Sequence, residues 1–193
     1  RRQPRRIAAA TSSRGGALRF EVFEAGAHGP QAGACVGGSE GVLLEAFLDA
    51  TPHAKGILFD LPDVIARARE PAFADRTEIV AGDFFEHVPT GGNLYLLKNI
   101  LHNCDDARCL QLLRNIHRAS PPASRLIVIE AVLSETADPA SVTMADLNML
   151  VLFGGRERTK KEFAALLDQT GFRLERVVHT SERLVSVIEA VKR

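Results

Sequence analysis

From residue 17 onward, short apolar runs rich in β-branched residues alternate with segments of helical periodicity. This alternation is typical of a parallel sheet covered by helices, because each connection between parallel strands needs a crossover segment. We therefore expect an α/β fold. Its strands are expected at residues 17–23, 56–61, 77–82, 93–99 and 125–133, its helices at 40–50, 105–119 and 159–169, and a closing hairpin at 172–178 and 184–191.

The length of 193 residues suits a single domain, and no internal repeat divides the chain. The first six residues include four arginines, and few side chains before residue 17 could face a core. We expect a loose basic tail or linker at residues 1–16, followed by one domain at 17–193. A basic arm that binds nucleic acid is the alternative, but no interleaved aromatic residues and no second basic patch support it.

The charge and cysteine content exclude several classes of protein. Lysine plus arginine equals aspartate plus glutamate, so the formal net charge is zero and no global field favours nucleic acid or a membrane surface. No apolar run approaches the length of a membrane span. Cys35, Cys104 and Cys109 contain no C-x-x-C pair, which argues against a disulfide framework and a zinc ribbon. We expect a cytoplasmic protein that needs no metal.

Two glycine runs, at residues 24–29 and 37–41, are candidates for a nucleotide-like cofactor loop. The second run leads directly into a helical pattern. Asp60 ends an apolar strand 23 positions after Gly37, which is the spacing of a βαβ unit whose strand-end carboxylate binds ribose hydroxyls. The alternative is that Asp60 caps the helix that begins near Pro62. Ligands of such folds lie beyond the carboxyl ends of the strands, where both candidates stand.

Polar residues also follow the later strands. Asp83 is followed by Phe84, whose ring would suit one wall of a purine site, and His102 follows the strand at 93–99. Glu130 lies inside an otherwise apolar strand, where a carboxylate is costly unless it has a partner. A second polar cluster at 154–159 interrupts an apolar helical pattern. A histidine flanked by carboxylates is suited to act as a general base.

Six segments in this order resemble the S-adenosylmethionine-dependent O-methyltransferases of the plant caffeic acid and bacterial natural-product type. They are GILFDLPDV, AGDFFEHVP, LLKNILHNCDD, RLIVIEAVL, MADLNML and GGRERTKKEFAALLDQTGF. The resemblance runs from about residue 36 to the C-terminus. It implies a class I methyltransferase (Rossmann-like) sheet of about seven strands with the last antiparallel. It also implies S-adenosylmethionine as the cofactor and S-adenosylhomocysteine as its product.

The resemblance also implies roles for individual residues. The residues implied to bind the cofactor are Gly37, Gly38, Gly41, Asp60, Leu61, Asp83, Phe84 and Lys98. His102 would take the proton from a hydroxyl of a small aromatic or polycyclic natural product, and Glu130 and Glu157 would hold that histidine in place. Residues implied to line the acceptor pocket are Met144, Asn148, Met149 and Phe153.

The sequence departs from the family pattern at several places. Cys35 and Ser39 stand where the family usually has an acid and a third glycine, and Asn103 and Cys104 follow the histidine in place of aspartate and tryptophan. Glu24 supplies an acid at the first glycine run, so it stays open whether Glu24 or Cys35 ends the first strand. Residues 17–23 would fill the central strand position, or a poor strand at 33–36 would do so.

The family usually carries an N-terminal dimerisation domain, for which the chain leaves no room, so we expect that domain to be absent. Two alternative functions follow. One is a non-catalytic or truncated cofactor-binding or assembly subunit of the same fold, and the other is a relative that uses the cofactor for non-methylating chemistry. The missing domain would leave an apolar face bare, which makes a homodimer possible.

Overall fold

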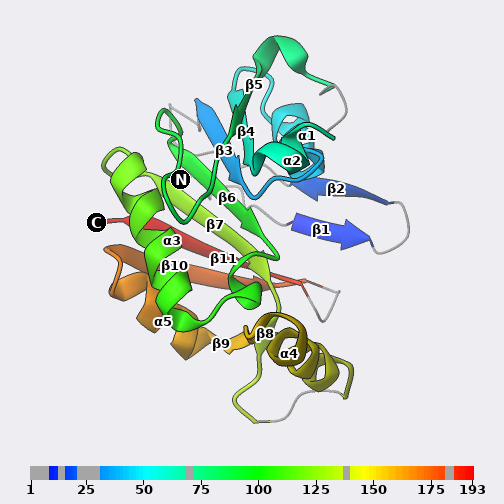
Figure 1. The fold of residues 1–193 in the computed structure, drawn as a ribbon, viewed down its shortest axis with the longest axis vertical. Helices are drawn as coiled ribbons and strands as arrows, with labels where there is room; N and C mark the ends of the chain where they lie inside the picture. The colour runs from blue at the N-terminus through cyan, green and yellow to red at the C-terminus, as the bar shows by residue number, and fades with distance from the viewer. Residues whose placement is uncertain (1–8, 13–15, 21–30, 68–71, 137–139, 181–184) are drawn as a thin grey trace, which may run out of the picture.

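The computed structural model describes residues 9–12, 16–20, 31–67, 72–136, 140–180 and 185–193. Its main sheet consists of β3 (Ala32–Val36), β4 (Lys55–Asp60), β5 (Thr77–Ala81), β6 (Leu94–Lys98), β7 (Arg125–Glu130), β10 (Phe172–His179) and β11 (Ser186–Lys192). The order of these seven strands is β10-β11-β7-β6-β3-β4-β5 (Figure 1). β11 is antiparallel to both of its neighbours, and all other neighbours in this sheet are parallel. The expected α/β class with an antiparallel last strand is confirmed.

Helices connect the strands on both faces of this sheet. They are α1 (Val42–Ala50), α2 (Pro62–Ile65), η1 (Ala74–Arg76), η2 (Leu101–Asn103), α3 (Asp106–Ala119), α4 (Ala140–Phe153) and α5 (Lys160–Asp168). The side chain of Asp105 caps α3 by accepting a hydrogen bond from the N–H of Arg108. Thr159 and Glu162 form a capping box at the start of α5, as the sequence predicts. Two short strands, β8 (Val132–Leu133) and β9 (Arg158–Thr159), pair in parallel beside the main sheet.

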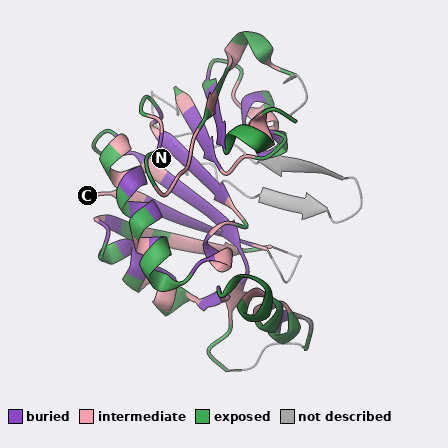
Figure 2. Ribbon diagram, viewed as in Figure 1, coloured by how far each residue is buried: buried purple, intermediate pink, exposed green. Residues whose placement is uncertain are grey.

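The core forms two layers because the strand side chains alternate between the faces of the sheet. Ala34 and Val36 of β3 belong to the cluster that contains the buried residues of α3 and α5, whereas Cys35 belongs to the cluster that contains those of α1. The strands are therefore buried on both sides, and Figure 2 shows most of the sheet as buried. A sheet covered in this way leaves its strand ends as the natural place for a site.

The first strand of the main sheet is β3, so the prediction that residues 17–23 fill the central position is wrong for the part of that segment that the structure describes. β2 (Gly16–Phe20) instead pairs antiparallel with β1 (Ala9–Ser12) in a separate two-stranded sheet. β3 looks poor as a strand because its small residues make room for α1: a Cβ on Gly33 would lie 2.5 Å from the Phe47 ring. Burial between two layers outweighs its low strand propensity.

Cys35 consequently stands in the first strand of the main sheet, paired with Leu58 of β4 and Leu96 of β6. Glu24 and the rest of the first glycine run lie outside the described residues. β1 falls within the segment 1–16, and it pairs with β2 and not with the main sheet.

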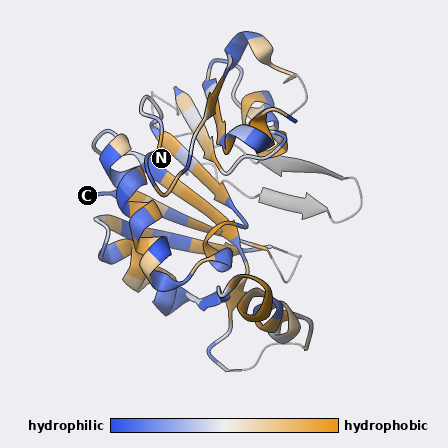
Figure 3. Ribbon diagram, viewed as in Figure 1, coloured by the Kyte–Doolittle hydropathy of each residue, from blue (hydrophilic) through white to orange (hydrophobic). Residues whose placement is uncertain are grey.

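The helix α4 differs from the other helices in its surroundings. It is hydrophobic around most of its circumference (Figure 3) and yet mostly exposed (Figure 2). Its large exposed apolar side chains are Met144, Leu147, Leu150, Val151, Leu152 and Phe153. None of the described helices is long and apolar enough to cross a membrane.

Candidate functional site

The candidate site lies where the strand order of the sheet reverses. From β3 the chain continues to β4 and β5 on one side and then returns to β6 on the other side of β3. Ligands of open α/β sheets bind at such a point, beyond the carboxyl ends of the strands. A cavity of about 250 Å³ is found there. It is lined by Cys35, Gly37, Gly38, Ser39, Glu40, Val42, Leu43, Lys98 and Asn99.

The second glycine run forms the turn between β3 and α1 and borders this cavity. The N–H groups of Gly37 and Gly38 both donate to the carbonyl of Phe59, at 2.8 and 3.2 Å. Gly37 and Gly41 have φ values of 68° and 86°, which a residue with a side chain rarely adopts. Ser39 also has a positive φ, 51°, at the place where the family pattern has glycine. The turn thus keeps the glycine-type conformation although one glycine is replaced.

Asp60 fixes this turn to the end of β4. Its carboxylate is buried, with Oδ2 accepting from the N–H of Ser39 at 2.8 Å and Oδ1 from the N–H of Leu61 at 2.7 Å. α2 has no side-chain cap, so the alternative in which Asp60 caps this helix is wrong. Each oxygen of a carboxylate has a second lone pair, so both can still accept a hydrogen bond from a ligand. Leu61 is partly exposed beside it.

Asp83 and Phe84 follow β5 on the same edge but do not line the cavity. Oδ1 of Asp83 accepts from the N–H of Phe85 at 2.7 Å, which stabilises the local turn. The ring of Phe84 reaches to within 3.6 Å of the position that a Cβ on Gly37 would take. Asn115 of α3 donates to the carbonyls of Phe84 and Phe85 and so holds this turn against the helix.

The cavity wall holds the ionisable residues Cys35, Lys98 and Glu40. Burial raises the pKa of the Cys35 thiol to about 12, with a further upward contribution from the charge of Asp60 and a downward one from Lys98. Cys35 is therefore a neutral thiol at physiological pH. The place where the family pattern has an acid contributes no negative charge here, while Glu40 on the same wall is a carboxylate that the sequence analysis does not single out.

His102 lies in η2, just beyond the end of β6, and contacts Glu157 directly. Its Nδ1 is 2.9 Å from Oε1 of Glu157, and the two side chains are 15% and 4% exposed. A carboxylate can only accept a hydrogen bond, so Nδ1 carries a proton, and in the neutral imidazole Nε2 keeps its lone pair. Burial by itself lowers the pKa of His102, but the hydrogen bond to Glu157, the charges of Glu130 and Glu157 and the main chain of Asn99 together raise it above its ordinary value.

Glu130 acts on the backbone of the turn that carries His102. This fully buried residue accepts hydrogen bonds at Oε1 from the N–H groups of Ile100 and Leu101, at 3.0 and 2.6 Å. Burial raises the pKa of Glu130 to about 7, against the opposing effects of the His102 charge and of these two N–H groups. Among the described residues, no hydrogen-bond partner reaches Oε2 of Glu130 or Oε2 of Glu157. The two acids therefore differ, since Glu157 contacts the imidazole and Glu130 the main chain.

Three residues of this site carry no individual signal in the sequence. The buried guanidinium of Arg158 contacts the turn around His102, a side chain on Gly155 would overlap the backbone of that turn, and Oδ1 of Asp146 accepts from the N–H of Glu157 at 2.8 Å. The polar cluster at 154–159 contains the first two of these residues. The position of this cluster after an apolar helix indicates a functional segment, but it does not indicate the separate role of each residue.

The residues predicted to line the acceptor pocket all belong to α4, and none of them lines the cavity described above. Met144 and Phe153 are 57% and 58% exposed. α4 lies beside η2, so these side chains and His102 are on neighbouring elements. The structure thus places their helix beside the turn of His102 and outside the wall of this cavity.

Comparison with known proteins relates this arrangement to a family. A profile of the O-methyltransferase domain matches residues 32–173. Phenazine O-methyltransferase PhzM of Lysobacter antibioticus is 44% identical over 159 residues, which are 80% of this chain and 46% of that protein. The mitomycin biosynthesis 6-O-methyltransferase of Streptomyces lavendulae is 44% identical over 158 residues, which are 80% of this chain and 45% of that protein.

A solved structure agrees with these matches. The S-adenosylhomocysteine-bound form of CalO1, a methyltransferase in calicheamicin biosynthesis, superposes with a TM-score of 0.77 at 37% identity, covering 84% of this chain and 49% of that one. The fold is therefore that of the class I methyltransferases. The chain spans about half the length of the curated relatives it matches. With the domain matched over residues 32–173 and relatives at 44% identity, the chain belongs to the O-methyltransferase domain family.

Proposed function

We propose that this chain is the catalytic region of an S-adenosylmethionine-dependent O-methyltransferase that acts on a hydroxyl of a small aromatic natural product. The observation that carries the proposal is the hydrogen-bonded pair His102 and Glu157, in which His102 follows shortly after Lys98 and Asn99 of the cavity wall. Family membership supports the reaction type. The relatives are named for phenazine and mitomycin chemistry, which supports an aromatic or polycyclic acceptor.

The residues at the cavity fit the proposed cofactor. When bound, S-adenosylmethionine supplies a methyl group activated by a positively charged sulfur. Gly37, Gly38 and Gly41 would let the main chain approach it closely, and the free lone pairs of Asp60 suit ribose hydroxyls. Leu61, Asp83, Phe84 and Lys98 stand at the same edge of the sheet and complete the proposed cofactor residues.

We assign the proton chemistry to His102. With Nδ1 donating to Glu157, Nε2 is the free nitrogen that would accept the proton of the acceptor hydroxyl. Glu157 stabilises the imidazolium that forms, and Glu130 contributes through its charge and through the turn that it holds. Positioning of reactants and exclusion of water supply the rest of the rate enhancement in reactions of this type.

The acceptor and the assembly are proposed from α4. Met144, Asn148, Met149 and Phe153 would contact the apolar ring of the acceptor, because α4 is apolar and lies beside the turn of His102. The exposed apolar area of α4 is also where a second copy of the chain would pack in a homodimer. The three cysteines are free and buried, which is consistent with the reducing cytoplasm that we propose as the location.

Two measurements test this function in sequence. Calorimetric titration with S-adenosylmethionine and S-adenosylhomocysteine should give binding heat, and its absence at millimolar ligand would overturn the cofactor assignment. Transfer of labelled methyl to a panel of hydroxylated aromatics should then be lost in His102→Ala while the affinity for S-adenosylhomocysteine persists. The matched control is His53→Ala, which changes an exposed histidine just before the start of β4, at the opposite end of that strand from Asp60, and should keep full transfer.

Retained transfer in His102→Ala would remove this residue from the role of base. Cofactor binding without transfer to any aromatic hydroxyl by the unaltered chain would favour a non-catalytic cofactor-binding subunit, or a relative that uses the cofactor for another reaction.

A further inference from the structure

Arg158 is completely buried, at 0% exposure, and is the largest fully buried side chain among the described residues. A charged side chain in a protein interior is costly unless its charge is paired and its donors are all used. Burial of this kind in a small domain calls for an explanation beyond packing, because an apolar residue would fill the same volume at lower cost.

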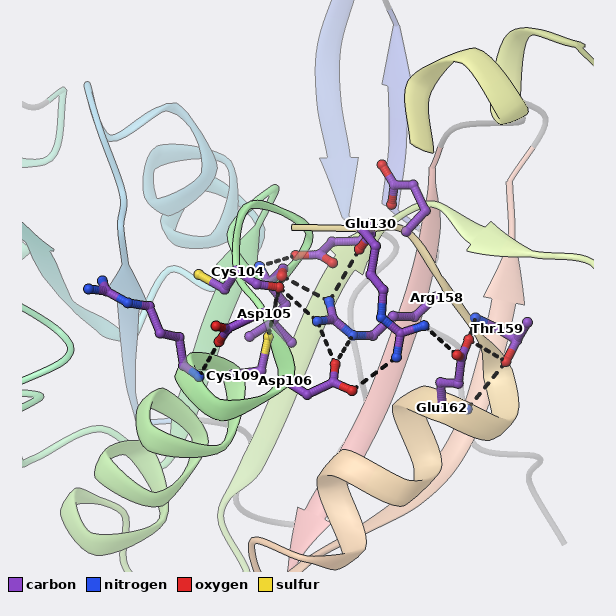
Figure 4. A network of polar contacts seen from close by, with 12 residues as sticks. Cys104, Asp105, Asp106, Cys109, Glu130, Arg158, Thr159 and Glu162 are labelled. Carbon is purple, nitrogen blue, oxygen red and sulfur yellow. Dashed lines mark hydrogen bonds and ion pairs between the residues drawn. The ribbon is translucent and has the colours of Figure 1, made fainter. Parts of the chain in front are cut away.

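The guanidinium uses all five of its N–H groups. Nη1 donates to the carbonyls of Leu101 and Arg156 at 2.9 and 3.2 Å, and Nη2 donates to the carbonyl of Cys104 at 2.8 Å. Nε and Nη2 also donate to Oδ1 of Asp106, at 3.0 and 2.8 Å (Figure 4). The carbonyls of Leu101 and Cys104 lie on either side of His102 and Asn103. The guanidinium of Arg158 is thus hydrogen-bonded to both ends of the turn that carries His102.

The segment that contains Arg158 lies directly against the same turn. A Cβ on Gly155 would overlap the carbonyl oxygen of His102, so only glycine permits this approach. Glu157, the residue before Arg158, forms the hydrogen bond to Nδ1 of His102, and its own N–H is held by Asp146 of α4. The partners in the His102 and Glu157 pair come from segments far apart in the sequence, and Arg158 joins these two segments by direct hydrogen bonds.

We propose that Arg158 is a positioning residue that fixes the turn of His102 against Glu157, so that Nδ1 stays hydrogen-bonded to the carboxylate and Nε2 stays free as the base. The proposal deepens the proposed function and rests on it only for the catalytic use of the pair. The charged groups that act on His102 are Glu157, next to β9, and Glu130 in β7. Arg158 acts on His102 through hydrogen bonds to main-chain carbonyls of its turn. We therefore expect a change at Arg158 to alter the position of His102, and not to act on it directly through charge.

Arg158→Lys separates geometry from charge, because lysine keeps the positive charge but offers three donors on one nitrogen and cannot form the same fork. In this variant we expect the turn to loosen and the hydrogen bond between His102 and Glu157 to weaken. Burial would then act on His102 with less opposition, and the pKa of His102 would fall. Loss of a hydrogen bond to a charged group should weaken the proton affinity of His102 about tenfold.

The test is an NMR titration of the histidine ring signals of the whole chain, with thermal unfolding measured in parallel. Arg76→Lys is the matched control, because Arg76 also donates to several carbonyls, those of Leu48, Thr51, Pro52 and Ala54, in a turn that does not contain His102. Both variants should lose stability, but only Arg158→Lys should lower the pKa of His102. An unchanged pKa together with a loss of stability similar to that of Arg76→Lys would overturn the proposal.

If Arg158→Lys does not fold, Asp106→Ala gives the same test, because the side chain of Asp106 is half exposed and its removal frees two of the five donors. The pKa of His102 should fall by a smaller amount, and an unchanged value would again contradict the proposal. Where methyl transfer is measurable, Arg158→Lys should lower kcat and leave the affinity for S-adenosylhomocysteine unchanged. A chain without methyl transfer would count against the proposed function but would leave the titration result intact.

Discussion

Replacing Glu157 by glutamine tests how the carboxylate at 2.9 Å from Nδ1 prepares His102. Glutamine has the same shape, and its amide oxygen can still accept the hydrogen bond, so the change removes the charge and puts an amide NH2 group in the place of Oε2, which has no hydrogen-bond partner among the described residues. Hydrogen bonds to charged groups contribute about 1.5–3 kcal/mol, against about 1 kcal/mol for neutral ones. We therefore expect roughly tenfold weaker proton affinity at His102 and a loss in kcat of about the same size.

The pH dependence of this variant has a definite sign. In the wild type the pKa of folded His102 is raised, so protonation of His102 stabilises the fold below the unfolded histidine pKa, and this contribution is lost as the pH rises through the folded pKa. Glu157→Gln should consequently lose more stability at about pH 5.5 than at about pH 8.5. The acidic limb of the rate profile should move to lower pH, since a weaker base loses its proton earlier.

Methyl transfer across the pH range and urea unfolding at both pH values measure these effects. Glu189→Gln is the control, because Glu189 is equally buried, at 4% exposure, and is paired with Arg125 and Arg176 away from the site. It should lower stability without moving the acidic limb. If Glu157→Gln leaves both the limb and the pKa of His102 where they are in the wild type, Glu157 does not act through its charge on the imidazole.

Three further changes have definite expected outcomes. Ser39→Gly removes a side chain at a φ of 51° and should stabilise the chain by about 1 kcal/mol in urea unfolding, whereas a loss of stability would show that the Ser39 side chain makes a contact of its own. Gly155→Ala places a methyl group on the carbonyl of His102 and should cost at least ~2 kcal/mol in the same assay, together with most of the activity. Burial raises the pKa of Glu130 to about 7 in the folded chain, so the free energy of unfolding should fall as the pH rises from the ordinary carboxyl pKa to about 7. Glu130→Gln should remove most of this pH dependence in unfolding measured from about pH 4 to pH 8.

Most of the sheet could be predicted from the sequence, because its strands are apolar runs that need no knowledge of their neighbours. β3 is the exception. Gly33 and Ala34 give it low strand propensity, and its place at the centre depends on Phe47 of α1 packing onto it, which is a tertiary contact. The segment before the first glycine run has a stronger strand pattern than residues 33–36. Local pattern alone therefore could not identify β3 as the strand that precedes the glycine turn at the cavity.

The candidate site shows the same division between local and tertiary information. His102 and Glu157 could be paired from the sequence only through a resemblance, since 55 positions separate them. Glu130 accepts from the N–H groups of Ile100 and Leu101, and Arg158 donates to the carbonyls of Leu101 and Cys104. These contacts cannot be predicted from a pattern of side chains, because every position has main-chain groups. Sequence reasoning can nominate a polar residue in an apolar segment, but the backbone group that it satisfies becomes visible only in the fold.

The two parts of the proposed reaction are supported to different degrees by the described residues. The turn of His102 is held by Glu130 from β7, by Glu157 at its side chain and by Arg158 at both of its ends, all within the buried part of the domain. The proposed acceptor residues, in contrast, lie on α4, where Met144 and Phe153 are more than half exposed. Asp146 connects the two parts, because it belongs to α4 and holds the N–H of Glu157. Anything that packs on α4, whether an acceptor or a second copy, acts on a helix that is hydrogen-bonded to Glu157, the acid of the proposed catalytic pair. We therefore expect binding at α4 to change the pKa of His102 through Asp146, which a titration of the His102 ring signals with and without the bound partner would measure.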